Sequence, residues 1–121
     1  MWSRTVETAV KLGYAVCRGS ADGNVVLAAD GTKPTFPVFS ERPDVGTAVD
    51  AGSTVALVTD SDDREIYVVL GAGVTEFDFG MSDTSGKWIH ATTGNYVGVQ
   101  FLQSGAAGDV IKARPAQFKL P

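Results

Sequence analysis

The chain contains very few of the residues on which metal and redox chemistry depend. Its 121 residues include one cysteine, Cys17, and one histidine, His90. A single cysteine cannot form an internal disulfide, and a zinc site needs three or four Cys, His or carboxylate ligands. The apolar neighbours of Cys17 are typical of a strand, so we expect a buried, unreactive thiol. A catalytic pair of Cys17 and His90 would also need an orienting acid, and the sequence does not place the two side chains together.

Long apolar runs and an excess of positive charge are also missing. The longest apolar runs, such as residues 25–29 and 66–70, are far shorter than the roughly 18 to 20 residues of a membrane helix. Glu7 stands where the apolar core of a secretion signal would begin. Lys and Arg number 10 against 14 Asp and Glu, so the net charge is -4 and no basic stripe is available for a phosphate backbone. We therefore expect no membrane span, no secretion signal and no nucleic-acid partner.

Three motifs resemble known sites, and each fails on spacing. Residues 59–65 resemble the start of a calcium loop, but Arg64 falls where an oxygen ligand belongs and Glu65 falls where the turn needs glycine. Residues 71–73, Gly-Ala-Gly, are not followed by the third glycine of a dinucleotide site. The pair at 86–87, Gly-Lys, is followed by tryptophan instead of the Ser or Thr of a phosphate loop. We expect no catalytic residue, no metal ligand and no cofactor, and hence no enzyme.

Glycine is abundant, and its distribution predicts the fold class. Fourteen glycines, from Gly13 to Gly108, divide the chain into apolar segments of roughly four to eight residues, as in short strands joined by tight turns. Val97, Val99 and Phe101 alternate with the residues between them at a period of two. We therefore expect a mainly β protein, a small compact β-barrel or β-sandwich with short strands and Gly-rich turns. Strands are predicted at residues 14–18, 25–29, 37–40, 54–59, 65–70, 74–79, 88–90, 96–102, 110–114 and 117–120.

The N-terminal segment fits two structures. Apolar residues recur at every fourth position from Trp2 to Val10, and Gly13 stands where a helix would stop. Residues 6–12 therefore fit a short helix, and an extended arm fits equally well. We expect residues 1–12 to form an N-terminal arm or short helix and residues 13–121 to form a single β domain.

Some aromatic residues lie outside the confident strands. Residues 32–49 hold three of the five prolines and are predicted to form a long loop region, because proline disfavours the middle of a sheet. Aromatic rings in that region and near the N-terminus pack either in the core or against a partner. Aromatic rings also stack on sugars, so a carbohydrate-binding or adhesion module is the alternative function. The candidate protein-interface residues are Trp2, Arg4, Val6, Phe36 and Phe39.

A fixed order of motifs runs through the C-terminal half of the chain. Residues 80–88 (GMSDTSGKW) form a glycine-flanked turn and strand, and residues 94–100 (GNYVGVQ) carry a Val-Gly-Val strand. Residues 106–113 (AAGDVIKA) place two small residues and Gly-Asp before a further strand. This order resembles that of bacteriophage capsid decoration proteins, the small head-stabilising or cement proteins. The resemblance covers residues 71–121, and residues 1–70 match it only in the style of their strands.

The resemblance implies a structural virion protein without catalytic residues or a cofactor. It implies a homotrimer at threefold or quasi-threefold positions on the outer surface of the capsid, where the protein stabilises the head. The N-terminal arm would touch the major capsid protein, which is the implied partner. The implied location is the exterior of the virion, with assembly in the host cytoplasm. An acidic chain without a secretion signal agrees with these expectations.

Overall fold

The computed structural model describes residues 1–121, and its regular structure is almost entirely β. Two five-stranded sheets and one two-stranded ribbon account for all twelve strands, so the expected mainly β fold is confirmed. No helix in the structure is long and apolar enough to cross a membrane. The elements are β1 (Trp2–Val6), β2 (Val10–Lys11), β3 (Ala15–Arg18), β4 (Asn24–Leu27), β5 (Thr35–Pro37), the 3-10 turn η1 (Arg42–Asp44), β6 (Ala48–Val49), β7 (Thr54–Leu57), β8 (Ile66–Val69), β9 (Phe79–Ser82), β10 (Trp88–His90), β11 (Tyr96–Phe101) and β12 (Val110–Lys119).

The first sheet curls until its two edges meet. Its strand order is β5-β3-β4-β1-β7, and β7 also bonds to the residues that follow β5. The N–H of Phe39 donates to the carbonyl of Ala56 at 2.8 Å, and the N–H of Val58 donates to the carbonyl of Pro37 at 3.1 Å. These bonds close the sheet into a small barrel, which removes the unpaired edges that would otherwise invite another strand. We call it the N-terminal barrel.

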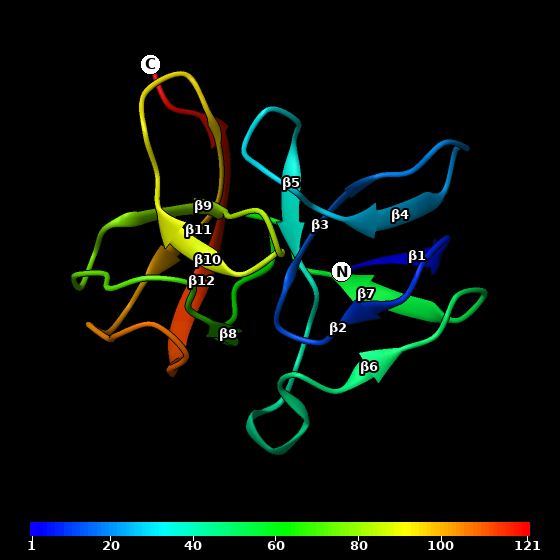
Figure 1. Ribbon diagram of the computed structural model, residues 1–121, viewed down its shortest axis with the longest axis horizontal. Coiled ribbons are helices and arrows are strands. Elements are labelled where there is room, and N and C mark those ends of the chain that lie inside the picture. The colour runs from blue at the N-terminus through cyan, green and yellow to red at the C-terminus, as the bar shows by residue number, and fades with distance from the viewer.

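The second sheet, with the order β10-β9-β11-β12-β8, curls in the same way. Leu70, directly after β8, forms a bridge with Trp88 of β10, and the N–H of Gly71 donates to the Trp88 carbonyl at 2.9 Å. We call this unit the C-terminal barrel. The two barrels lie side by side, with β5 at their boundary (Figure 1).

Each barrel encloses its own apolar core. The β2–β6 ribbon adds Val10 to the core of the N-terminal barrel, where Leu12 and Val49 also pack. The C-terminal barrel holds the larger core, and four residues from the first part of the chain complete it. The N-terminal core consists of Val6, Val10, Val16, Val25, Val38, Val55 and Leu57. The C-terminal core consists of Ala15, Cys17, Ala28, Val58, Ile66, Val68, Leu70, Val74, Trp88, Val99, Phe101, Ile111 and Ala113.

Trp88 joins the two barrels. Its side chain is fully buried, and its indole N–H donates to the carbonyl of Gly13 at 3.1 Å, just before β3. Gly98 of β11 lies against the ring so closely that a Cβ atom there would stand 2.5 Å from a ring carbon. The N–H of Ala15 donates to the carbonyl of Gly86 at 2.8 Å and reinforces the same junction. A large aromatic side chain with a satisfied polar group thus fills the boundary.

Of the two structures that the sequence allows at the N-terminus, the short helix at residues 6–12 is not formed. The N-terminal segment is extended, and β1 lies inside the first sheet, parallel to β4 and antiparallel to β7. Residues 1–12 are therefore not a separate arm but part of the N-terminal barrel. A spacing of four keeps side chains on one face of a strand as well as of a helix, and β-branched residues such as Thr5, Val6 and Val10 favour the strand.

Other predicted strands differ in their bounds. Residues 74–79 were expected to form one strand, but β9 begins only at Phe79 and a tight turn precedes it. The turn forms because Asp78 accepts a hydrogen bond from the Thr75 N–H at 3.2 Å, an interaction that competes with extended pairing. The two strands predicted within residues 110–120 form one strand, β12. Residues 32–49, expected as a loop region, contain β5, η1 and β6.

The close approach of Gly98 to Trp88 gives a stability prediction. Gly98→Ala places a methyl group 2.5 Å from the Trp88 ring and 3.1 Å from the Thr35 carbonyl oxygen, so the junction must shift. We expect a loss of about 1–3 kcal/mol in the free energy of unfolding, measured by urea denaturation. Gly73→Ala is the matched control, because its nearest neighbour would be 3.8 Å away. Equal unfolding midpoints for the two variants would contradict the assigned packing.

Candidate interaction surface

One end of the N-terminal barrel is open, and three of the candidate interface residues meet there: Trp2, Arg4 and Phe36. Trp2, Arg4 and Val6 alternate along β1, so their side chains share the face that carries the barrel core. The β2–β6 ribbon packs near Val6, whereas the Trp2 end has no such cover. A pocket of about 220 Å³ lies at that end, lined by Trp2, Arg4, Arg18, Gly23, Asn24, Val25, Phe36 and Leu57. We call this surface the open barrel end.

The centre of the open barrel end is aromatic. The rings of Trp2 and Phe36 have their centres 5.5 Å apart and are inclined by 52°. The guanidinium carbon of Arg4 lies 5.3 Å from the centre of the Trp2 ring, in the range of a cation–π interaction. Trp2 nevertheless remains 46% exposed, so a large part of the ring is free to contact another molecule.

Positive charge surrounds these rings. Arg18 lines the same pocket and, with Lys33, Pro34 and Phe36, a neighbouring groove of about 390 Å³. Arg18 also pairs with Asp22 at 2.6 Å, and this hydrogen-bonded ion pair lowers the pKa of the Asp22 carboxyl. Three cations, counting Arg4, therefore surround an apolar centre on a chain whose net charge is -4. Such a surface suits a partner with acidic groups around an apolar side chain.

Two of the five candidate residues do not belong to this surface. Val6 is only 1% exposed and packs in the core of the N-terminal barrel, so it cannot contact a partner in the folded protein. Phe39 is half-buried against the core of the C-terminal barrel, with the Arg64 guanidinium 4.9 Å above its ring. The sequence grouped these residues by region, whereas barrel closure determines which side chains reach the open barrel end.

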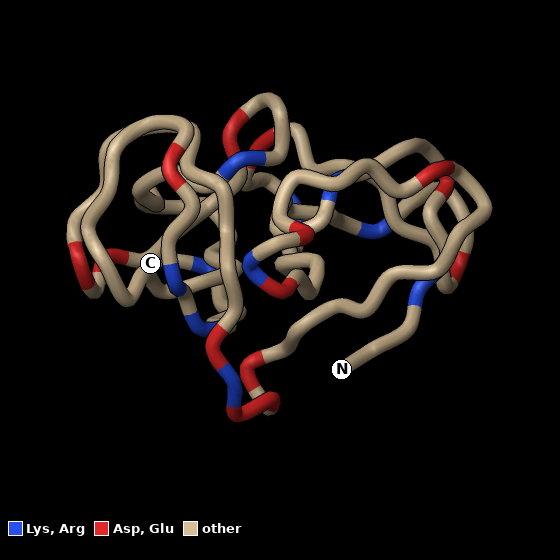
Figure 2. Tube along the Cα trace, turned by 90° about the horizontal axis from the view of Figure 1, so that it is seen from below, with Lys and Arg blue, Asp and Glu red and all other residues tan.

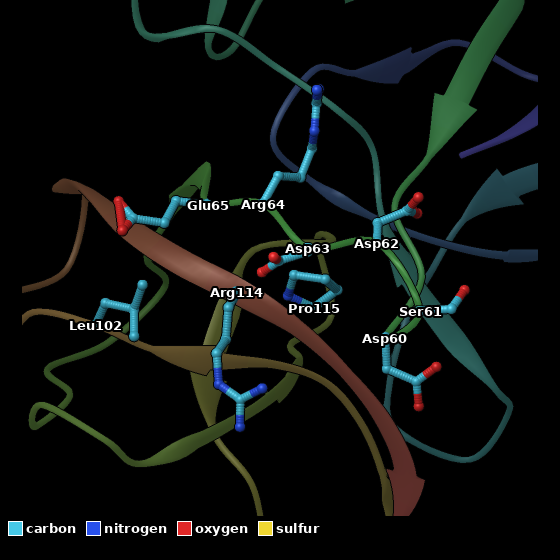
Figure 3. A pocket seen from close by; sticks show the side chains of 9 residues that line it. All are labelled: Asp60, Ser61, Asp62, Asp63, Arg64, Glu65, Leu102, Arg114 and Pro115. Atoms are coloured by element: carbon cyan, nitrogen blue, oxygen red, sulfur yellow. The ribbon is translucent and has the colours of Figure 1, made fainter.

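The acidic loop between β7 and β8 is built around Asp62. This loop projects beside the N-terminus (Figure 2), and its carboxylates point in different directions (Figure 3). It borders a pocket of about 570 Å³, and no group of three His, Cys, Asp or Glu residues in the structure could hold a metal ion. Asp62 accepts hydrogen bonds from the Thr59 N–H at 2.8 Å and from the N-terminal amine at 2.9 Å. The Thr59 bond and then the amine lower the pKa of Asp62.

The residues considered for nucleophilic chemistry lie in different surroundings. Cys17 is 7% exposed and faces the core of the C-terminal barrel, where burial raises the pKa of its thiol and so disfavours the reactive thiolate. His90 is at the surface, and its Nδ1 lies 3.2 Å from a carboxylate oxygen of Asp78. The structure thus pairs His90 with an acid but not with Cys17.

Comparison with known proteins identifies a shared fold. No family model matches the chain, and no curated protein matches it. Among solved structures, it is similar to the crystal structure of the N base of head fiber gp8.5 of bacteriophage phi29, with a TM-score of 0.66 and 14% sequence identity. The match covers 99% of this chain and 96% of that chain, so the likeness extends over both barrels. The comparison therefore shows that this chain shares its fold with a phage head fiber protein.

The hydrogen bonds of Asp62 with the Thr59 N–H and then with the N-terminal amine lower its pKa and so predict a pH dependence of stability. A carboxyl whose pKa is lowered on folding stabilises the folded state above its ordinary value of 3.8, and this stabilisation is lost as the pH falls through the lowered pKa. Asp62→Asn should therefore melt below the parent chain at about pH 7, and the difference should shrink in acid. Asp63→Asn, in the same loop, is the control. A difference independent of pH would refute the assigned role.

Proposed function

We propose that the chain is a structural protein of a phage virion that binds the outer surface of the assembled capsid and stabilises the head. The observation that carries the proposal is the likeness over nearly the whole of both chains to the N base of a phage head fiber. The order of motifs in residues 71–121, which resembles that of capsid decoration proteins, points to the same class. The proposed role needs no catalytic residue and no cofactor, and it involves neither nucleic acid nor a membrane.

The proposed partner is the major capsid protein, and the proposed assembly is a homotrimer at threefold or quasi-threefold positions. A protein that binds only the assembled lattice stabilises it by mass action, because dissociation of the shell must also release the bound copies. Three linked copies gain further affinity, since the second and third contacts form within one complex. A modest contact area per copy is then sufficient. The proposed location is the virion exterior, after assembly in the host cytoplasm.

The open barrel end is the proposed contact with the capsid. Its rings supply apolar area around Trp2 and Phe36, and its cations suit an acidic patch on the capsid. Large aromatic and arginine side chains supply much of the binding energy in many protein interfaces. The open barrel end combines both in Trp2 and Arg4.

The alternative of a carbohydrate-binding module has less support. A sugar platform needs open ring faces, but Trp88 and Phe101 are fully buried. Trp2 is partly exposed, yet Arg4 lies over its ring and Phe36 is inclined against it. The rings at the open barrel end are therefore arranged for a shaped, charged surface more than for a flat sugar.

Binding to heads tests the proposal. We expect the chain to cosediment with mature capsids and to raise the temperature at which they release their contents. Trp2→Ala should weaken binding about tenfold or more, because it removes an exposed aromatic contact and the stacking partner of Arg4. Substitution is preferable to truncation, since Trp2 pairs with Leu57 in the barrel.

Phe118→Ala is the matched control for this experiment. Phe118 is 37% exposed on β12, in the C-terminal barrel, and does not line the open barrel end. We expect it to bind heads like the parent chain. Free protein beside undecorated heads would reject the proposed function, and equal losses for the two variants would reject the open barrel end as the contact.

A further inference from the structure

Phe77 is the most exposed large apolar residue of the protein, and its backbone is strained. It is 62% exposed, and with a φ of 71° it is the only non-glycine residue in the left-handed region. This conformation is disfavoured for a bulky L-residue, and such strain concentrates at functional positions. Glycine would adopt the conformation freely. The protein therefore keeps an exposed ring at a position where glycine would be less costly.

The loop between β8 and β9 holds Phe77 firmly. Its N–H donates to the Phe101 carbonyl at 2.8 Å, and its own carbonyl accepts a hydrogen bond from Gln100 Nε2 at 3.0 Å. Both bonds tie the backbone to β11, while the ring stays exposed. The loop lies at the edge of the C-terminal barrel, away from the N-terminal barrel (Figure 1). Glu76 and Asp78 flank the ring, and we call residues 76–78 the acidic knob.

A pocket of opposite character lies where the β2–β6 ribbon meets the turn between β9 and β10. Its volume is about 360 Å³, and most of its lining is apolar. The ammonium of Lys11 lies 5.5 Å from the centre of the Tyr14 ring, and Lys87 contributes a second positive charge. No acidic residue lines it, although acids outnumber bases in the chain. We call it the basic socket; its lining is Ala9, Val10, Lys11, Tyr14, Leu27, Ala48, Ser85 and Lys87.

We propose that the acidic knob of one copy binds in the basic socket of a second copy. In this contact the Phe77 ring enters the apolar lining and the exposed carboxylate of Glu76 faces Lys11 and Lys87, whereas Asp78 stays bonded to the Thr75 N–H and close to His90. The negative charge of the knob and the positive charge of the socket favour binding of the knob into the socket. Because both surfaces belong to this chain, the occupant is a second copy of it. Burial of an exposed ring adds the apolar contribution.

The contact joins two different surfaces, so each copy uses its knob once and its socket once. A contact of this kind generates a closed ring when the rotation between copies closes. The inference deepens the proposed function because it names the contact between copies. It depends on the proposed function only for the number of copies in the ring, which is three.

Two variants test the contact: one removes the acidic knob, and the other blocks the basic socket. Phe77→Gly removes the ring and suits the positive φ. At a concentration where the parent chain is monomeric, the variant should melt at a temperature no lower than the parent chain, and at higher concentration it should fail to associate. Ala9→Glu places a carboxylate in the basic socket at an exposed position, where it repels the acidic knob. By sedimentation equilibrium, the parent chain should associate with increasing concentration, and each variant alone should stay monomeric.

Mixing the variants gives the decisive measurement. Phe77→Gly keeps an intact basic socket and Ala9→Glu keeps an intact acidic knob, so an equimolar mixture should form a 1:1 dimer and nothing larger. A mixture that stays monomeric while the parent chain associates would overturn the inference, as would parent-like association of either variant. A parent chain that remains monomeric up to about 1 mM would overturn it as well.

Head binding separates this inference from the proposed function. A chain that associates through the acidic knob but does not bind heads removes the proposed function and leaves the contact between copies standing. If Phe77→Gly loses head binding while its mass in solution matches that of the parent chain, the acidic knob contacts the capsid and the inference fails.

Discussion

The burial of Trp88 between two curled sheets is the constraint on which the rest of the structure depends. Its ring needs a glycine opposite, which Gly98 supplies, and its N–H needs an acceptor, which is the Gly13 carbonyl. An unpaired indole N–H at a dry boundary would cost a large part of the gain from burying the ring. Its backbone meanwhile bonds to Gly71 and closes the C-terminal barrel. One residue thus sets both the closure of one barrel and the position of the other.

Closure also decides which surfaces remain for partners. A closed sheet has no free edge, so another chain cannot simply add a strand along it. What remains are side chains at barrel ends and in loops. Trp2 lies at the open barrel end. Phe77 lies between β8 and β9, whose connecting loop is at the far edge of the other barrel (Figure 1). Both rings stay exposed because no element of the same chain covers them.

The sequence predicted what depends on local patterns and missed what depends on distant partners. The period of two placed a strand at residues 96–102, and β11 is Tyr96–Phe101. The N-terminus was ambiguous because a repeat of four fits both a helix and one face of a strand, and its partners β4 and β7 lie far along the chain. Trp2 and Phe36 were grouped because they lie near the N-terminus and in the proline-rich region, and closure of the barrel brings their rings together. Val6 was included because burial inside a barrel cannot be read from a single strand.

The positive φ of Phe77 had no signal in the sequence, since glycine normally marks that conformation. The residue was read as part of a strand because Val74, Phe77 and Phe79 are apolar. The hydrogen bond from Thr75 to Asp78 converts that stretch into a turn and directs the ring outward. A core residue needs only the right size and polarity, whereas a strained, exposed ring is stable only if surrounding bonds hold it. Those bonds come from β11, so the strand that pairs with both β9 and β12 also holds the one non-glycine residue in the left-handed region.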